Sequence, residues 1–177
     1  MHKLIPNIFT FISNFKKEEI LNLDKKVGII FRNYEKEQNK NELLELRQFC
    51  KMHNRKIYLA NNLRLSVTLD FDGYYIPAFN NNLGIQKYNL KKDFLIFGSA
   101  HNALEIRTKE KQGAELIFLS PIFKIKKYKR SLEIIKFNIL VQKSQTKIIA
   151  LGGINKKNIK KLKITNVYGF SGISYFK

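Results

Sequence analysis

The stretch that decides the fold lies near the end of the chain and reads KIIALGGINKKNIKKLKITNVYGFSGIS, from Lys147 to Ser174. It holds two short apolar runs, Lys147–Leu151 and Val167–Phe170, each followed by glycines, and the lysine-rich segment between them is long enough for one helix. Glycine lets backbone N–H groups approach an anion closely, and a helix that follows adds its positive N-terminal end. Either turn alone is equally well explained by glycines that only make a tight corner. The pair at this spacing favours a phosphate site of the kind found in many barrels of alternating strands and helices.

The same alternation of a short apolar run and a helical run recurs through the rest of the chain. Near-continuously apolar strands that alternate with helices imply a parallel sheet buried on both faces. Eight such units favour a closed (β/α)8 TIM barrel over an open doubly wound sheet. Helices are expected at residues 16–23, 41–52, 63–69 and 103–111, with a further helix capped by Ser131. The six strands predicted before those already quoted are Ile8–Ile12, Val27–Phe31, Ile57–Ala60, Gly73–Ile76, Phe94–Phe97 and Leu116–Leu119.

The length is short for such a barrel. At 177 residues, 44% of them hydrophobic, the chain suggests a single domain over 1–177 with a sizeable core, whereas a TIM barrel usually takes at least roughly 200 residues. The sequence stops soon after the eighth strand, so we expect a trimmed α/β barrel whose final helix is largely missing. A barrel loses an outer helix more readily than a strand, because an unpaired strand edge is a liability. A homo-oligomer in which a second subunit covers the trimmed unit stays open.

The charge balance is strongly basic. Lysine and arginine total 33 against 14 aspartates and glutamates, a net charge of +19, which is compatible with a nucleic-acid or acidic-membrane partner. Yet lysine, asparagine and isoleucine are enriched together along the whole chain, which indicates a compositional bias at tolerant surface positions. Such a bias, combined with phosphorylated small-molecule substrates, accounts for the charge better than dedicated nucleic-acid binding.

The chain lacks the features of secreted and membrane proteins. A single cysteine, Cys50, excludes an internal disulfide framework and a cysteine-based zinc cluster. Its place in an apolar helical pattern favours a buried, inert thiol. No apolar run reaches the roughly 18 residues that a membrane-spanning helix needs. We therefore expect a soluble cytoplasmic protein without a membrane partner.

In a TIM barrel the active site forms at the C-terminal ends of the strands. The residues at these positions are rich in hydrogen-bond donors and poor in carboxylates, and they offer no Ser-His-Asp arrangement, no paired acids and no His-rich metal cluster. Such a set suits the binding of an anionic, polar, ring-containing substrate better than hydrolysis. Its members are Arg32, Asn33, Tyr34, Asn61, Asn62, Pro77 to Asn80, Ser99, His101, Ser120 to Lys127, Gly152, Gly153, Gly172, Ile173 and Ser174.

Several of these segments, taken in order, resemble one known family. The run from Asp72 to Ile76 resembles its Asp-Gly-Val-His-Leu element, and Gly98 to His101 resembles its Gly-Ser-x-His. The run from Gly113 to Phe123 resembles its Gly-Ala-Asp-Tyr-x-x-x-Ser-Pro-x-Phe. On this series the chain resembles the thiamine-phosphate synthase / TenI family of TIM barrels. Further matching segments, in the family's order, are Gly28–Arg32, Tyr58–Asn62 and Leu151–Ile154.

The resemblance implies a transferase of thiamine biosynthesis that joins hydroxymethylpyrimidine diphosphate to a thiazole phosphate, with release of diphosphate and formation of thiamine phosphate. It implies that Arg32 and Asn61 hold the pyrimidine diphosphate and that Ser99 donates to its oxygens. Mg²⁺ is expected to bridge the diphosphate oxygens. The remaining substrate-binding residues that the resemblance implies are Gly152, Gly153, Gly172, Ile173, Ser174, His101 and Lys127.

The departures from the family fall where diphosphate and metal should meet. Asn62 and Asn80 stand where the family has two magnesium-binding aspartates, and an uncharged amide binds a hard cation more weakly. Ile30 and Tyr34 replace the glutamine and lysine that flank the arginine, and Pro121 stands where the tautomerase branch has histidine. We expect a divergent thiamine-phosphate synthase-like transferase. The alternative is a catalytically impaired member that binds a phosphorylated thiamine precursor without turning it over, and a nucleic-acid-binding module ranks below both.

Overall fold

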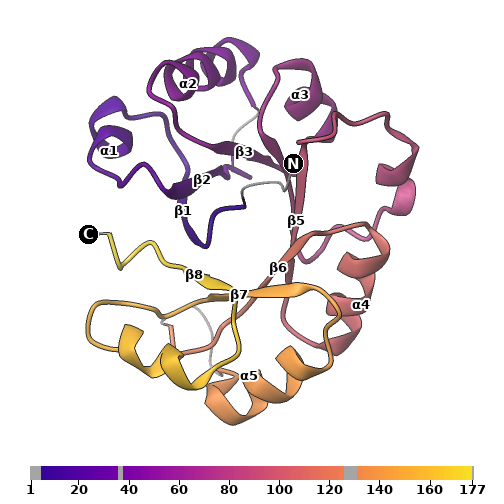
Figure 1. The fold of residues 1–177 in the computed structure, drawn as a ribbon. Helices are drawn as coiled ribbons and strands as arrows, with labels where there is room; N and C mark the ends of the chain where they lie inside the picture. The colour runs from indigo at the N-terminus through magenta and orange to yellow at the C-terminus, as the bar shows by residue number, and fades with distance from the viewer. Residues whose placement is uncertain (1–4, 36–37, 126–130, 177) are drawn as a thin grey trace.

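The fold is a closed barrel of eight parallel strands (Figure 1). The computed structural model describes residues 5–35, 38–125 and 131–176. Each strand pairs with the next one along the chain, and β8 returns to β1. The prediction of a TIM barrel is therefore confirmed. The strands are β1 Ile8–Ile12, β2 Val27–Phe31, β3 Ile57–Ala60, β4 Gly73–Ile76, β5 Leu95–Ala100, β6 Leu116–Leu119, β7 Lys147–Leu151 and β8 Gly169–Ser171.

Helices form an outer ring around the strands (Figure 1). Most are short, and residues 172–176, which follow β8, form no helix, as expected for a trimmed barrel. Among the described residues no helix has both the length and the apolar character needed to cross a bilayer. The helices are α1 Lys17–Leu21, α2 Lys40–Met52, α3 Leu63–Thr68, α4 Ala103–Lys111 and α5 Glu133–Gln142, with the 3₁₀ helices η1 Leu83–Lys87 and η2 Ile159–Ile164.

The lysine-rich segment between β7 and β8 differs from the prediction of a regular helix. It forms the 3₁₀ helix η2, and the residue that precedes η2, Asn158, makes no side-chain capping bond. Lysines at 156, 157, 160, 161 and 163 place like charges three and four residues apart, and such pairs destabilise an α-helix. As a result, the glycine turn after β7 is not followed by the α-helix that would have added a positive N-terminus.

The predicted cap of α5 is also wrong. The N-cap residue of α5 is Leu132, which makes no side-chain capping bond. The Ser131 hydroxyl instead donates to the carboxylate of Glu133. The end of α4 matches the predicted range of 103–111, and Gly113 follows the helix with a left-handed φ of 80°.

Aromatic side chains fill the interior of the barrel. Phe9, Tyr58, Phe97 and Phe118 are completely buried. The ring centroids of Tyr58 and Phe97 lie 4.6 Å apart, and those of Phe9 and Phe118 lie 5.0 Å apart in an edge-to-face arrangement. Such pairs contribute about 0.5–1.5 kcal/mol each beyond the burial of their area. The interior is thus a packed core, so a substrate can enter only at the mouth of the barrel.

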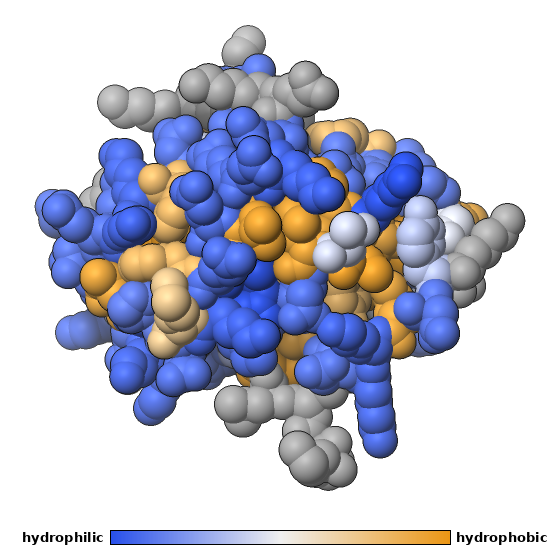
Figure 2. Space-filling model, turned by 90° about the horizontal axis from the view of Figure 1, so that it is seen from above, coloured by the Kyte–Doolittle hydropathy of each residue, from blue (hydrophilic) through white to orange (hydrophobic). Residues whose placement is uncertain are grey.

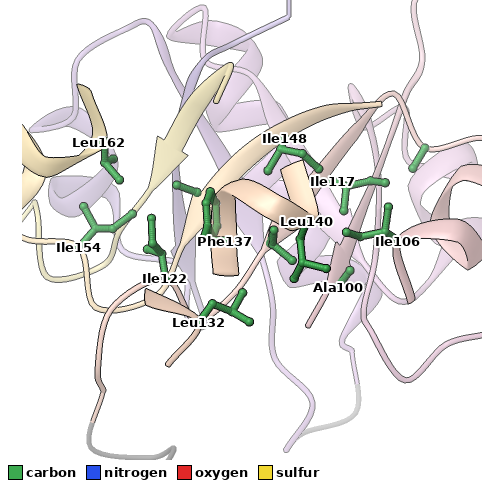
Figure 3. Packing of buried hydrophobic residues seen from close by; sticks show 13 residues of the cluster. Ala100, Ile106, Ile117, Ile122, Leu132, Phe137, Leu140, Ile148, Ile154 and Leu162 are labelled. Atoms are coloured by element: carbon green, nitrogen blue, oxygen red, sulfur yellow. The ribbon is translucent and has the colours of Figure 1, made fainter. Parts of the chain in front are cut away.

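A second apolar layer lies between the strands and the outer helices. In Figure 3 Phe137 and Leu140 of α5 face Ile148 of β7 and Ile117 of β6. Figure 2 views the side that lies uppermost in Figure 1, and on this face blue, hydrophilic residues dominate, with orange, hydrophobic ones between them. This layering holds the strand ends, and the residues that follow them, in fixed places.

Candidate functional site

Arg32 is the first residue after β2 and is held by stacking. Its backbone N–H donates to the Ile12 carbonyl at 2.8 Å, and its guanidinium carbon lies 4.3 Å from the centre of the Phe11 ring. No carboxylate pairs with Arg32 within the described part of the chain. A cation stacked on an aromatic face keeps its N–H donors for another partner. Arg32 is therefore placed to bind an anion.

A cavity of about 500 Å³ opens beside Arg32. Its walls come from β1, from the segment between β1 and α1, from α1 and the residues that follow it, and from the residues after β8. The α1 wall contributes the carboxylate of Glu19, which pairs with Lys16 at 2.9 Å. Arg32 and Ile173, which the sequence assigns to two different substrates, both line it, together with Thr10, Ser13 and Lys16. The structure thus brings together one predicted residue from each half of the barrel.

The turns after β7 and β8 lie against each other. A side chain added at Gly172 would place its Cβ 3.3 Å from the carbonyl oxygen of Ile154. Ile173 and Ser174, which follow, are exposed. Gly172 after β8 therefore lies beside Ile154, the residue that follows Gly152 and Gly153 after β7.

The glycines after β7 also have a packing reason. Gly152 and Gly153 have φ values of +96° and +72°, in the left-handed region. A Cβ on Gly152 would lie 2.7 Å from Cα of Pro121, and a Cβ on Gly153 would lie 2.8 Å from the Phe123 carbonyl. Both glycines are required where this turn meets the segment after β6, whether or not a phosphate binds. Lys127, also predicted to bind substrate, lies outside the described residues.

Asn61 and Asn80 meet at the ends of β3 and β4. The Asn80 amide nitrogen donates to the Asn61 side-chain oxygen at 3.0 Å and to the Tyr74 hydroxyl at 3.4 Å. Burial raises the pKa of Tyr74 to about 12, so its hydroxyl stays protonated at neutral pH. Asn61 has a left-handed φ of 59°, a conformation that asparagine tolerates. These contacts join two of the predicted site residues.

The residues present do not fit the magnesium site that the family implies. The side-chain oxygen of Asn62 caps α3 by accepting the Leu65 N–H at 3.0 Å, and that of Asn80 accepts the Asn82 N–H at 3.0 Å. Among the described residues no group of three or more His, Cys, Asp or Glu side chains gathers. Mg²⁺ is usually held through one or two carboxylates. Asn62 and Asn80, the predicted weak ligands, therefore do not suit a magnesium ion.

Ser99 lies inside β5 rather than after it. The predicted strand ended at Phe97, but the pairing with β6 continues through Ser99 and Ala100. Ser99 is 6% exposed, and its hydroxyl lies 3.5 Å from the Ile76 carbonyl oxygen of β4. Because residues alternate along a strand, Ser99 points the same way as Phe97, into the barrel. Ser99 is thus near the mouth but largely covered in this structure.

His101 connects the ends of β5 and β6. Its Nδ1 lies 2.8 Å from the Ser120 carbonyl oxygen, and its backbone N–H donates to Glu105 at 2.8 Å. Asn102 caps α4 by accepting the Glu105 N–H. Glu105 and Asn102 thus form a reciprocal capping arrangement like that of a capping box. These contacts give His101 a structural role at the start of α4.

One polar residue near the site was missed from the sequence. Lys109 of α4 is fully buried and donates to the Asn80 carbonyl and to Gln112. Burial lowers the pKa of Lys109 to about 8. The sequence indicated only that Lys109 would be buried, because it lies three residues after Ile106, on the face of α4 that turns to the core.

A family model described as "Thiamine monophosphate synthase" matches residues 18–176. The chain belongs to this thiamine monophosphate synthase family. Thiamine-phosphate synthases with similar sequences occur in Syntrophomonas wolfei, 28% identical over 147 residues, and in Prochlorococcus marinus subsp. pastoris, 29% identical over 124 residues.

The extent of these matches differs between relatives of the family. The alignment spans 79% of this chain and 70% of the Syntrophomonas protein, but 69% of this chain and only 35% of the Prochlorococcus protein. A thiamine phosphate pyrophosphorylase from Pyrococcus furiosus has a similar structure, with a TM-score of 0.74, 18% identity and coverage of 94% of this chain and 84% of that one. At that identity the structural likeness speaks for the fold alone.

Proposed function

We propose that this thiamine monophosphate synthase family member is a transferase that joins hydroxymethylpyrimidine diphosphate to thiazole phosphate. The carbon–oxygen bond between the pyrimidine methylene and diphosphate breaks, and the diphosphate leaves with the electron pair. The thiazole nitrogen supplies the pair for the new carbon–nitrogen bond. Membership of the family and names of relatives from two organisms support this reaction.

The single observation that carries the proposal is the cavity shared by Arg32 and Ile173. Arg32 would hold the diphosphate and stabilise its growing negative charge as it leaves. Ile173, with Gly153 and Ser174, would offer backbone and hydroxyl donors to the thiazole phosphate. Two anionic groups bound on either side of one cavity bring the reacting carbon and nitrogen together, which is the main contribution that a positioning site makes.

Asn61 and Ser99 complete the proposed diphosphate half. Asn61 is fixed by Asn80 at the end of β3. Ser99 would turn its hydroxyl from the Ile76 carbonyl, a long contact of 3.5 Å, towards a diphosphate oxygen. Both are neutral donors, so the positive charge comes from Arg32 rather than from these two residues.

The test is formation of thiamine phosphate by the purified protein from the two substrates, with and without Mg²⁺. Arg32→Gln is expected to lower kcat/KM about 100-fold, since hydrogen bonds to a charged group contribute about 1.5–3 kcal/mol each. Arg107→Gln, which removes an exposed arginine of α4, is the matched control and should leave kcat/KM unchanged. Equal activity of the two variants would refute the role of Arg32.

A second candidate is a binding protein that holds a phosphorylated thiamine precursor without turnover. The observation that favours it is the neutral pair Asn62 and Asn80, whose side-chain oxygens are already engaged. Calorimetric binding of both substrates without any product would support this candidate over the enzyme. Product formation that does not respond to chelators would support the enzyme with a site that works without metal.

A further inference from the structure

Two buried polar side chains of α4 and the residue after it converge on the segment that follows β4. Lys109 and Gln112 are both 0% exposed. The Lys109 ammonium donates to the Asn80 carbonyl, and Gln112 donates to the carbonyls of Asn80 and Asn82 at 2.9 Å each. Gln112 also accepts from Lys109 at 3.0 Å. Between 29 and 32 residues along the chain separate these side chains from the carbonyls they reach, so their contact is a product of the fold.

The lysine stem packs over a glycine on the outer, helix-facing side of β5. A Cβ on Gly98 of β5 would lie 2.8 Å from Cγ of Lys109 and 2.9 Å from its Cβ. Any larger residue in β5 at this point would displace the stem. The absence of a side chain at Gly98 therefore leaves the path by which Lys109 reaches the segment after β4.

Asn80 connects Lys109 and Gln112 to the candidate site through its own hydrogen bonds. Its backbone carbonyl is held from behind by Lys109 and Gln112, its backbone N–H donates to the Pro77 carbonyl at 3.1 Å, and its side chain donates to Asn61. Asn61 in turn donates its backbone N–H to the Tyr75 carbonyl at 3.0 Å. A continuous set of hydrogen bonds thus runs from α4 to the mouth of the barrel.

We propose that Lys109 is a positioning residue, which fixes the segment after β4 so that Asn80 holds Asn61 in place for the diphosphate. This inference rests on the proposed function. A buried ammonium is costly unless it is hydrogen-bonded, and a methionine of similar length would fill the same space without that penalty. Its two acceptors, the Asn80 backbone carbonyl on this segment and the Gln112 side-chain oxygen, explain why a lysine stands there.

The experiment compares Lys109→Met with Lys111→Met, a change at an exposed lysine of the same helix. Hydrogen–deuterium exchange of the full chain is expected to rise at least tenfold over residues 77–82 in Lys109→Met. Exchange over β6 should not change. Gln112→Leu, which keeps the lysine, should give a smaller rise in the same segment and serves if Lys109→Met fails to fold. Unchanged exchange over residues 77–82 in the folded variants would overturn the proposal.

A double-mutant cycle separates positioning from mere stabilisation. We expect Lys109→Met to lower kcat/KM about tenfold, and the Lys109→Met/Asn80→Ala double variant to be no slower than Asn80→Ala, because Lys109 acts through the Asn80 side chain. Fully additive losses would contradict the proposal. If the wild type makes no thiamine phosphate, the proposed function fails. In that case the role of Lys109 is decided by two other measurements. One is the exchange over residues 77–82, and the other is the affinity of the same four proteins of the cycle for inorganic diphosphate.

Discussion

Removal of the Tyr58 hydroxyl should stabilise the protein. Tyr58 is fully buried in the barrel interior, and its hydroxyl has no hydrogen-bond partner among the described residues. Burial also raises the pKa of Tyr58 above its ordinary value, as expected for a phenol surrounded by Phe9 and Phe97. A buried hydroxyl without a partner costs about 1–3 kcal/mol relative to water. Tyr58→Phe keeps the ring and removes that cost, so we expect a gain of about 1 kcal/mol.

The assay is urea unfolding followed by circular dichroism, supported by a thermal melt. For a domain of this size about 1 kcal/mol corresponds to roughly 2–4 °C in Tm. Tyr168→Phe is the matched control, because the Tyr168 hydroxyl donates to the Ile5 carbonyl at 2.7 Å. The control should lose about 1 kcal/mol. If Tyr58→Phe loses as much as the control, the Tyr58 hydroxyl has a good partner and the reasoning is refuted.

Two further predictions concern Asp70 and Cys50. A hydrogen bond from Lys91, with Arg47 nearby, lowers the pKa of Asp70. The contribution of the Asp70 carboxylate to the stability of the fold is therefore fully present above its ordinary pKa of 3.8. That contribution is lost as the pH falls through the lower pKa of the folded state. Asp70→Asn, which suits the left-handed φ of 59°, should reduce stability at pH 7 by about 0.5 kcal/mol, as for a partly exposed pair, and by nothing near pH 2. An equal loss at both pH values in urea melts would contradict this. Burial raises the pKa of Cys50 to about 12, so Ellman's reagent at pH 8 should leave the folded protein unmodified and label it fully in guanidinium; rapid labelling of the folded protein would count against a buried thiol.

Most strands were predictable because they are short apolar runs bounded by polar or glycine residues, whereas the strand predicted at Val167–Phe170 forms at Gly169–Ser171. The error in β5 had a local cause, since Gly98, Ser99 and Ala100 have small side chains that read as a turn. They are strand residues because β6 supplies their pairing partners. The segment after β7 has apolar residues at a helical spacing, which is why an α-helix was predicted there. Repulsion between its lysines disfavours that α-helix, and the segment forms the 3₁₀ helix η2 instead.

The candidate site was predictable only in part. Arg32 and Ile173 followed from their places at strand ends, and the cavity brings them together. The helix caps formed by Asn62 and Asn102 depend on where α3 and α4 begin. A prediction that takes every residue after a strand as a site residue does not consider this. Lys109 could not be assigned because its partner, Asn80, is 29 residues away and contributes a backbone carbonyl, which carries no sequence signature.

The contact between β1 and β8 has a consequence for synthesis of the chain. These strands share only two residue pairs, Ile8 with Phe170 and Phe9 with Ser171, and the Ser171 hydroxyl donates to the Phe9 carbonyl 162 positions away. While the chain emerges from the ribosome, β1 and the most recent strand therefore present open edges until β8 is free to pair with β1. Contacts of such sequence separation form slowly, and open edges invite intermolecular pairing. Nascent chains that pause before residue 169 are accordingly those for which a chaperone matters most.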